Sequence, residues 1–140
     1  MGNGDAYAKI GYFYTLGEGV EKNDSLAFEN YKKAADLKSA NGALNLGVQY
    51  ILGSVTAKDL KEAEKWHIKA VEYGSAEAAW RLYTIYTNGD LFPKDEVKAE
   101  EFLQKALKAK HPEACCLMGY RYYLGKSVEK DNQQAFIYYK

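Results

Sequence analysis

Two cysteines and two histidines are the side chains here that catalytic and metal sites use most often. Cys115 and Cys116 are adjacent, and neighbours on a helix point about 100° apart, so they cannot form an ordinary disulfide. We expect two reduced thiols packed at a helix start, which favours a cytoplasmic location. A periplasmic or secreted location behind a signal peptide is the alternative. No further ligand lies at metal-site spacing, so we expect no metal ion.

The two histidines occupy positions that predict packing and capping. His67 falls in the middle of an expected helix, at a position that is held by Tyr31, Leu103 and Tyr139 in the other sequence repeats described below. His111 precedes Pro112 and takes the position of a helix N-cap. Neither histidine has a cysteine or carboxylate at the spacing of a metal site or a catalytic triad. We therefore expect no catalytic residue, no cofactor and no enzymatic activity.

Composition argues against several other classes of protein. The chain has 19 basic and 19 acidic residues and no net charge, whereas nucleic-acid binding uses a basic surface. No apolar run approaches the roughly 20 residues that a membrane span needs. Gly17 and Gly19 resemble part of a phosphate loop, but no strand precedes them. An apolar content of 47% with only two prolines predicts one folded, helical domain.

The sequence repeats itself every 36 residues without an insertion or deletion. Five columns stay in register through four copies, which predicts an array of repeats. The columns are Ile10, Leu46, Leu82 and Met118; Tyr14, Tyr50, Tyr86 and Tyr122; Gly17, Gly53, Gly89 and Gly125; Asn23, Asp59, Asp95 and Asp131; and Ala27, Ala63, Ala99 and Ala135. We expect a single domain, 1–140, with repeats at about 3–38, 39–74, 75–110 and 111–140. The last repeat is expected to be incomplete, as in a fragment of a longer array or one without its cap.

Each repeat has the signals of a helix, a short turn and a second helix. The glycine column supplies the left-handed residue that ends the first helix. The Asn/Asp column supplies the N-cap of the second helix, with a capping box expected at Asp59–Glu62 and at Asp131–Gln134. Asn3, Ser39 and Ser75 are expected to cap the first helices. The expected first helices are about 5–16, 40–52, 76–88 and 112–124, the second about 24–37, 60–73, 96–109 and 132–140, and no strand is expected.

The spacing of apolar and small residues predicts how the helices pack. Ala6, Ile10 and Tyr14 lie four residues apart, and we expect this set to face the second helix of its own repeat. The alanine column and the glycines Gly11, Gly47 and Gly119 should let the two helices approach closely. Tyr83 replaces that glycine in the third repeat, so looser packing is expected there. Phe136 and Tyr139 should be exposed at the last repeat, where self-association is expected.

These columns resemble a known family of repeats. The pattern A-x-x-x-L-G-x-x-Y-x-x-G-x-G-V, followed by D-x-x-x-A and K-A-A, is similar to the Sel1-like repeat, a relative of the tetratricopeptide repeat. Leu91 and Phe92 depart from it where the pattern has Gly-Val, and the chain lacks the cysteines of the disulfide-rich branch. The resemblance implies an all-α fold, a right-handed α-solenoid of four stacked helix-turn-helix repeats. It also implies a concave face and a role in protein complexes, often in bacteria.

Helix geometry then predicts which residues line that concave face. In tetratricopeptide relatives it is formed by the side of the first helices opposite the packed side, and the resemblance implies the same here. The candidate protein-binding residues are Tyr12, Asn41, Asn45, Val48, Glu77, Trp80, Arg81, Thr84, Cys116, Tyr120 and Tyr123. Amides and Arg81 can bind a peptide backbone or a carboxylate, and aromatic rings can act as anchors. Packing of Trp80 and Tyr120 between neighbouring repeats is the alternative.

The function expected from these observations is that of a non-enzymatic interaction module. It would act as an adaptor or a bacterial regulator that binds a protein or peptide in its groove, without nucleic acid or membrane as partner. One alternative is an inhibitor or immunity protein that blocks one enzyme. A second alternative is an enzyme or ligand-binding protein that uses the same groove, which would need ionisable groups converging there.

Overall fold

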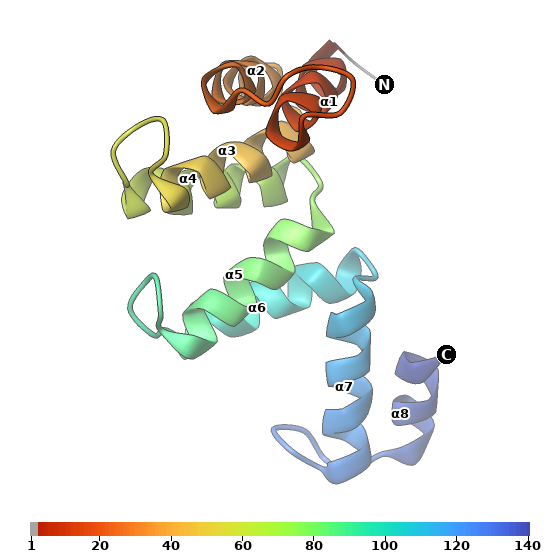
Figure 1. Cartoon of the computed structure of the whole chain (residues 1–140). Helices are drawn as coiled ribbons and strands as arrows, with labels where there is room; N and C mark the ends of the chain where they lie inside the picture. Colours follow the sequence, from red (N-terminus) through yellow and green to blue (C-terminus); the bar gives the residue numbers. More distant parts are fainter. Residues whose placement is uncertain (1–2) are drawn as a thin grey trace.

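Eight α-helices form four antiparallel hairpins that follow one another along a curved path (Figure 1). The structure is a computed structural model that describes residues 3–140. The first helices of the hairpins are α1 (Asn3–Leu16), α3 (Ala40–Leu52), α5 (Ala76–Asn88) and α7 (Pro112–Leu124). The second helices are α2 (Asp24–Asp36), α4 (Leu60–Glu72), α6 (Glu96–Lys108) and α8 (Asn132–Tyr139). No strand occurs in this range, so the all-helical repeat fold expected from the sequence is confirmed.

The turn inside each hairpin is built in the same way four times. The glycine column has positive φ, between 67° and 75°, where a residue with a Cβ would be strained. The Asn or Asp that follows caps the second helix with its side chain, as Asn23 does for the backbone N–H of Leu26. Its own backbone N–H donates to the carbonyl of the tyrosine column, for example Asn23 to Tyr14 at 3.0 Å. These bonds close the turn from both sides.

Three of the expected caps need correction. The capping boxes form only in half: Asp59 accepts from the N–H of Glu62, but its own N–H is bonded to the Tyr50 carbonyl, so Glu62 is not needed as its acceptor. The same holds at Asp131, whose N–H donates to Tyr122. Asn3 lies inside the first turn of α1 instead of before it, and the preceding residues are outside the described range.

Glycines bring the two helices of a hairpin together, as expected. A Cβ on Gly11 would lie 2.8 Å from the ring of Tyr31, and a Cβ on Gly47 would lie 2.5 Å from His67 Nδ1. In the third hairpin the large side chain comes from the first helix, as Tyr83, and the second helix carries the smaller, fully buried Leu103. Tyr83 packs against the cluster that contains Leu103, so the two helices have exchanged which of them supplies the large side chain.

Two members of the set, Ala6 and Ile10, do not face their partner helix, contrary to the expectation. The tyrosine column does, since Tyr122 stacks on Tyr138 in the second helix of its own repeat, with ring centroids 5.7 Å apart. Ala6 and Ile10 are exposed, whereas Leu46, in the column of Ile10, is buried against the preceding repeat. A Cβ on Gly42, in the column of Ala6, would lie 2.4 Å from the Cβ of Ala34 in the preceding helix α2. The columns of Ala6 and Ile10 therefore lie at the junction between repeats, and the described residues contain no repeat before these two.

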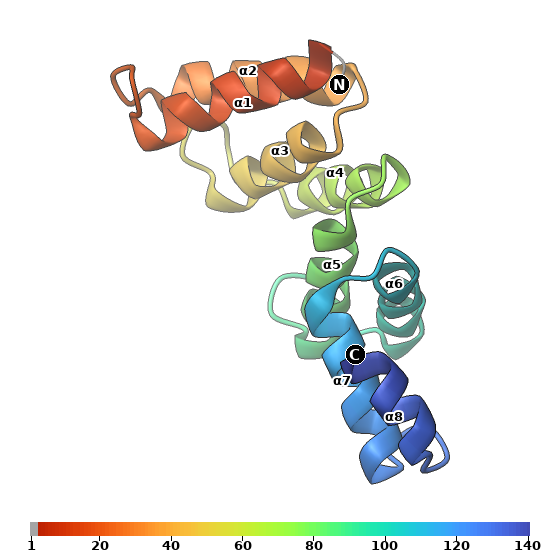
Figure 2. The same cartoon turned by 90° about the vertical axis from the view of Figure 1, so that its right-hand side faces the viewer.

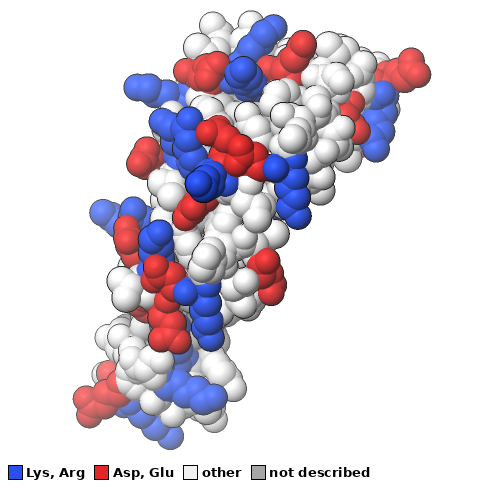
Figure 3. Space-filling view, turned by 90° about the vertical axis from the view of Figure 1, so that its left-hand side faces the viewer, with Lys and Arg blue, Asp and Glu red and all other residues white. Residues whose placement is uncertain are grey.

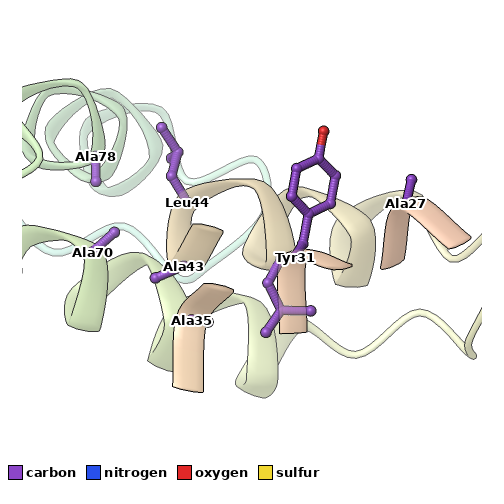
Figure 4. Packing of buried hydrophobic residues seen from close by; sticks show 8 residues of the cluster. Ala27, Tyr31, Ala35, Ala43, Leu44, Ala70 and Ala78 are labelled. Atoms are coloured by element: carbon purple, nitrogen blue, oxygen red, sulfur yellow. The ribbon is translucent and has the colours of Figure 1, made fainter. Parts of the chain in front are cut away.

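Alanine dominates the interior between helices, with a few large side chains at the junctions. In the cluster that joins the first three hairpins, alanines from α2, α3, α4 and α5 lie around Tyr31 and Leu44 (Figure 4). Successive hairpins are rotated relative to one another (Figures 1 and 2). The helices α1 and α7 lie at opposite ends of the array in both views. Residues of α1 and α7 consequently cannot share one small pocket.

Candidate functional site

The first two repeats form a pocket between α1 and α3. It is lined by six residues, all on the side of the first helices that helix geometry predicts as the binding face: Asp5, Ala8, Lys9, Tyr12, Asn41 and Asn45. Each belongs to one of four repeat columns with the spacing that places side chains on one helix face. Three of the candidate residues, Tyr12, Asn41 and Asn45, are thus brought together.

Unused hydrogen-bonding groups distinguish this pocket. Within residues 3–140, the side-chain amides of Asn41 and Asn45 form no hydrogen bond, and Lys9 forms no ion pair. Asp5 is engaged through one oxygen, which accepts from the Ser39 hydroxyl at 2.9 Å. Tyr12 is 50% exposed and offers a ring face beside these polar groups. The pocket can therefore bind a polar backbone through amides and an apolar side chain through the ring.

A second cluster of candidate residues lies at the junction of the third and fourth repeats. Glu77 accepts a hydrogen bond from Arg81 Nε, and its other carboxylate oxygen lies 2.9 Å from His111 Nε2. His111 is buried, its ring stacks on Trp80 with centroids 5.5 Å apart, and its Nδ1 lies 3.3 Å from a Glu113 carboxylate oxygen without forming a hydrogen bond. The polar groups of Glu77 and Arg81 are thus occupied within the protein.

Trp80 follows the alternative considered from the sequence. It is half-buried and packs between its own repeat and the next, against His111 and Tyr83. Tyr120, in contrast, is 50% exposed on α7 and is not buried between repeats. Sequence reasoning missed the contact between His111 and Glu77, because the two residues are 34 positions apart in the chain. The repeat register links them, since Ser39 and Asp5 occupy the same two columns and are hydrogen-bonded in the same way.

The pKa of Glu77 is lowered, first by its hydrogen bond to His111 and then by that to Arg81. A carboxylate whose pKa is depressed in the folded state stabilises that state above its ordinary pKa, near 4.3, and loses this contribution as pH falls. We expect Glu77→Gln to lower the free energy of unfolding by roughly 0.5 kcal/mol at pH 6, because solvent screens a half-exposed pair. Urea unfolding should show the difference shrinking towards pH 3; a constant difference would contradict it.

The other candidate residues are dispersed along the array. Val48 and Thr84 are half-buried, and the Thr84 hydroxyl donates to the Arg81 carbonyl at 2.8 Å. Cys116 and Tyr123 are exposed on α7, at the far end from α1. They form part of neither cluster. Both cysteines are free thiols, as expected.

His67 packs in the interior, as predicted from its column. It is fully buried, its Nδ1 lies 2.7 Å from the Ala63 carbonyl oxygen, and burial lowers the pKa of its imidazole. Among residues 3–140, no three His, Cys, Asp or Glu side chains converge as a metal site would require.

Charged side chains of both signs are distributed over the face shown in Figure 3, which is the left-hand side of the molecule in Figure 1. Lysines and acidic residues are interspersed there, with uncharged surface between them, and no large patch of one sign appears on this face. In the described part of the chain, no helix has the length and apolar character to cross a membrane.

These features define an α-solenoid of helix hairpins. The chain belongs to the Sel1 repeat family: the family model matches residues 4–39, 40–75, 76–111 and 112–140. The resemblance noted in the sequence is thereby confirmed, and members of this family generally act as protein-interaction scaffolds.

Solved structures agree with this assignment. A Sel1 repeat protein from Oxalobacter formigenes is 34% identical, with a TM-score of 0.79 over 97% of this chain and 56% of that one. A protective antigen of uropathogenic Escherichia coli strains, with the same repeat fold, is 32% identical, with a TM-score of 0.77 over 97% of this chain and 29% of that one. Cysteine-rich protein B of Helicobacter pylori is 25% identical, with a TM-score of 0.67 over 81% of this chain and 90% of that one.

This chain thus spans about half or less of the first two proteins. No curated protein matches it.

Proposed function

We propose that the chain is a non-enzymatic adaptor that binds an extended segment of a partner protein in the pocket between α1 and α3. One observation carries the proposal: Asn41, Asn45 and Lys9 converge on a pocket without internal partners, beside the exposed ring of Tyr12. An extended peptide offers backbone groups to the amides and an acidic or C-terminal carboxylate to Lys9.

The cluster around Glu77 supports this choice by comparison. There the candidate side chains neutralise one another, and Trp80 is stacked against His111, so little hydrogen-bonding capacity is free for a ligand. We infer that this cluster holds the fourth repeat in place and that the partner's main anchor lies in the first two repeats. The expected cytoplasmic location stays a prediction.

The test measures binding after the partner has been identified. Affinity capture from the native host with mass spectrometry would supply the protein, and overlapping synthetic peptides of it would supply the ligand. In fluorescence anisotropy, the double variant Tyr12→Ala/Asn45→Ala should bind the peptide about 1–4 kcal/mol more weakly, as expected for central anchors. Both positions retain solvent exposure, so circular dichroism should not change.

The control replaces an amide elsewhere. Asn88→Ala, at the exposed end of α5, should leave the affinity unchanged. Unchanged binding by the double variant, with an intact fold, would place the anchor outside this pocket. Loss of binding on Trp80→Ala alone, with the fold intact, would move it to the third repeat.

A further inference from the structure

One column of the first helices carries side chains of different size at successive junctions between repeats. In the second repeat this column holds Leu44, which is 8% exposed and belongs to the buried cluster that includes Ala78 of α5 (Figure 4). In the third repeat it holds Trp80, whose ring stacks on that of His111, the residue before α7. The protein's own side chain is thus packed towards the next repeat at both junctions.

In the first repeat the same column holds Ala8, whose side chain is a single methyl group. Ala8 is 5% exposed and lines the pocket of about 450 Å³ between α1 and α3. The bond from the Ser39 hydroxyl to Asp5 shows that this side of α1 faces the second repeat, so the pocket lies between two described repeats. A small residue therefore leaves open, at the first junction, a space of the kind that larger residues fill at the next two.

Polar groups of the same pocket are spaced for the backbone on both sides of an inserted residue. Asn41 and Asn45 lie one turn apart on α3, about 6 Å along the helix axis. In an extended segment, the residues before and after the inserted one are about 6.6 Å apart, and their backbone groups point to the same edge. Within residues 3–140 neither side-chain amide forms a hydrogen bond, so each is free to bind one of these two backbone groups.

We propose that Ala8 determines the specificity of this pocket: the partner segment inserts one apolar side chain, of leucine size or larger, in the place that Leu44 and Trp80 occupy at the later junctions. The methyl group of Ala8 and the ring of Tyr12 provide apolar contacts for it, and its burial contributes to affinity through the hydrophobic effect. This inference rests on the proposed function and specifies which residue of the extended segment is recognised.

Two capped amino acids test the inference without the partner. In N-acetyl-leucine amide and N-acetyl-alanine amide, the side chain is flanked by both backbone groups. Nuclear magnetic resonance titration of the isotope-labelled chain would follow the backbone signal of Ala8 and the side-chain amide signals of Asn41 and Asn45. The leucine compound should shift these signals, and the alanine compound should bind about tenfold or more weakly, because it buries less apolar surface.

Filling the pocket from within should remove this binding. Ala8→Leu gives the first junction the residue that Leu44 supplies at the second, and the leucine compound should then no longer shift the signals of Asn41 and Asn45, while circular dichroism stays helical. Ala57→Leu adds the same side chain at an exposed position in the turn after α3 and should bind the compound like the unaltered chain. If Ala8→Leu does not fold, the comparison of the two compounds on the unaltered chain decides.

Three results would overturn the role of Ala8: no shift in the pocket, equal binding of the two compounds, or a folded Ala8→Leu variant that still binds the leucine compound. The proposed function is tested separately, by the Tyr12→Ala/Asn45→Ala variant with the partner peptide. Loss of peptide binding in that variant, together with equal binding of the two compounds, would keep the proposed function and reject this inference.

Discussion

Leu103→Tyr is expected to lower the free energy of unfolding by roughly 1–3 kcal/mol, through overpacking against Tyr83. Leu103 is fully buried, so a larger ring has no free volume to enter. Tyr83→Gly is expected to cost about 3 kcal/mol, because it removes a packed ring and places glycine in a helix. Urea unfolding followed by circular dichroism would measure both changes.

The two changes together should largely compensate. The double variant recreates the arrangement of Gly11 with Tyr31, in which the first helix is small where the second carries a ring. We expect its destabilisation to be smaller than the sum of the single changes by about 2 kcal/mol. Tyr120→Gly, at an exposed helical position, measures the helix-propensity part alone. If the two changes in the free energy of unfolding are additive, the side chains of residues 83 and 103 do not compete for the same space between α5 and α6.

Gly42→Ala should destabilise the protein by about 1–3 kcal/mol, through overpacking where the first and second repeats meet. Its Cβ would lie 2.4 Å from the Cβ of Ala34 and 2.9 Å from the backbone nitrogen of Ala35, and backbone cannot move aside cheaply. The sign is informative, because alanine in place of glycine inside a helix otherwise stabilises by about 0.5–1 kcal/mol. Thermal or urea unfolding gives the answer directly.

Ala6 supplies the matched control for this prediction. It occupies the column of Gly42 but is exposed, since no described repeat precedes it. Ala6→Leu should therefore change the free energy of unfolding by no more than about 0.5 kcal/mol. A stabilised Gly42→Ala variant would mean that α3 does not approach α2 as closely as the structure has it.

Local signals in the sequence were sufficient for the helices and turns. Helix ends depend on interactions within a few residues, such as positive φ at Gly53 and the side-chain cap of Asp59. Such local interactions can be predicted from the sequence. The 36-residue register supplied the rest, because four equivalent hairpins have to stack in an equivalent way. The family and the all-helical fold follow from these features.

The direction in which each helix face points was decided by tertiary structure. Spacing shows that Ala6, Ile10 and Tyr14 share a face, but not whether a partner helix or a neighbouring repeat covers it, since both are apolar surfaces. The contacts of Gly42 with α2 show that the neighbouring repeat covers this part of the face in the second repeat. Ile10, which has no described repeat before it, is exposed.

The candidate site shows the same division. Helix periodicity by itself selected the polar side of the first helices, which contains Tyr12, Asn41 and Asn45. Only the packed structure shows that these residues meet in one pocket while Glu77 is bound to His111, 34 residues away. The physical reason is that periodicity describes one helix at a time, whereas a pocket or an ion pair depends on the rotation between successive hairpins.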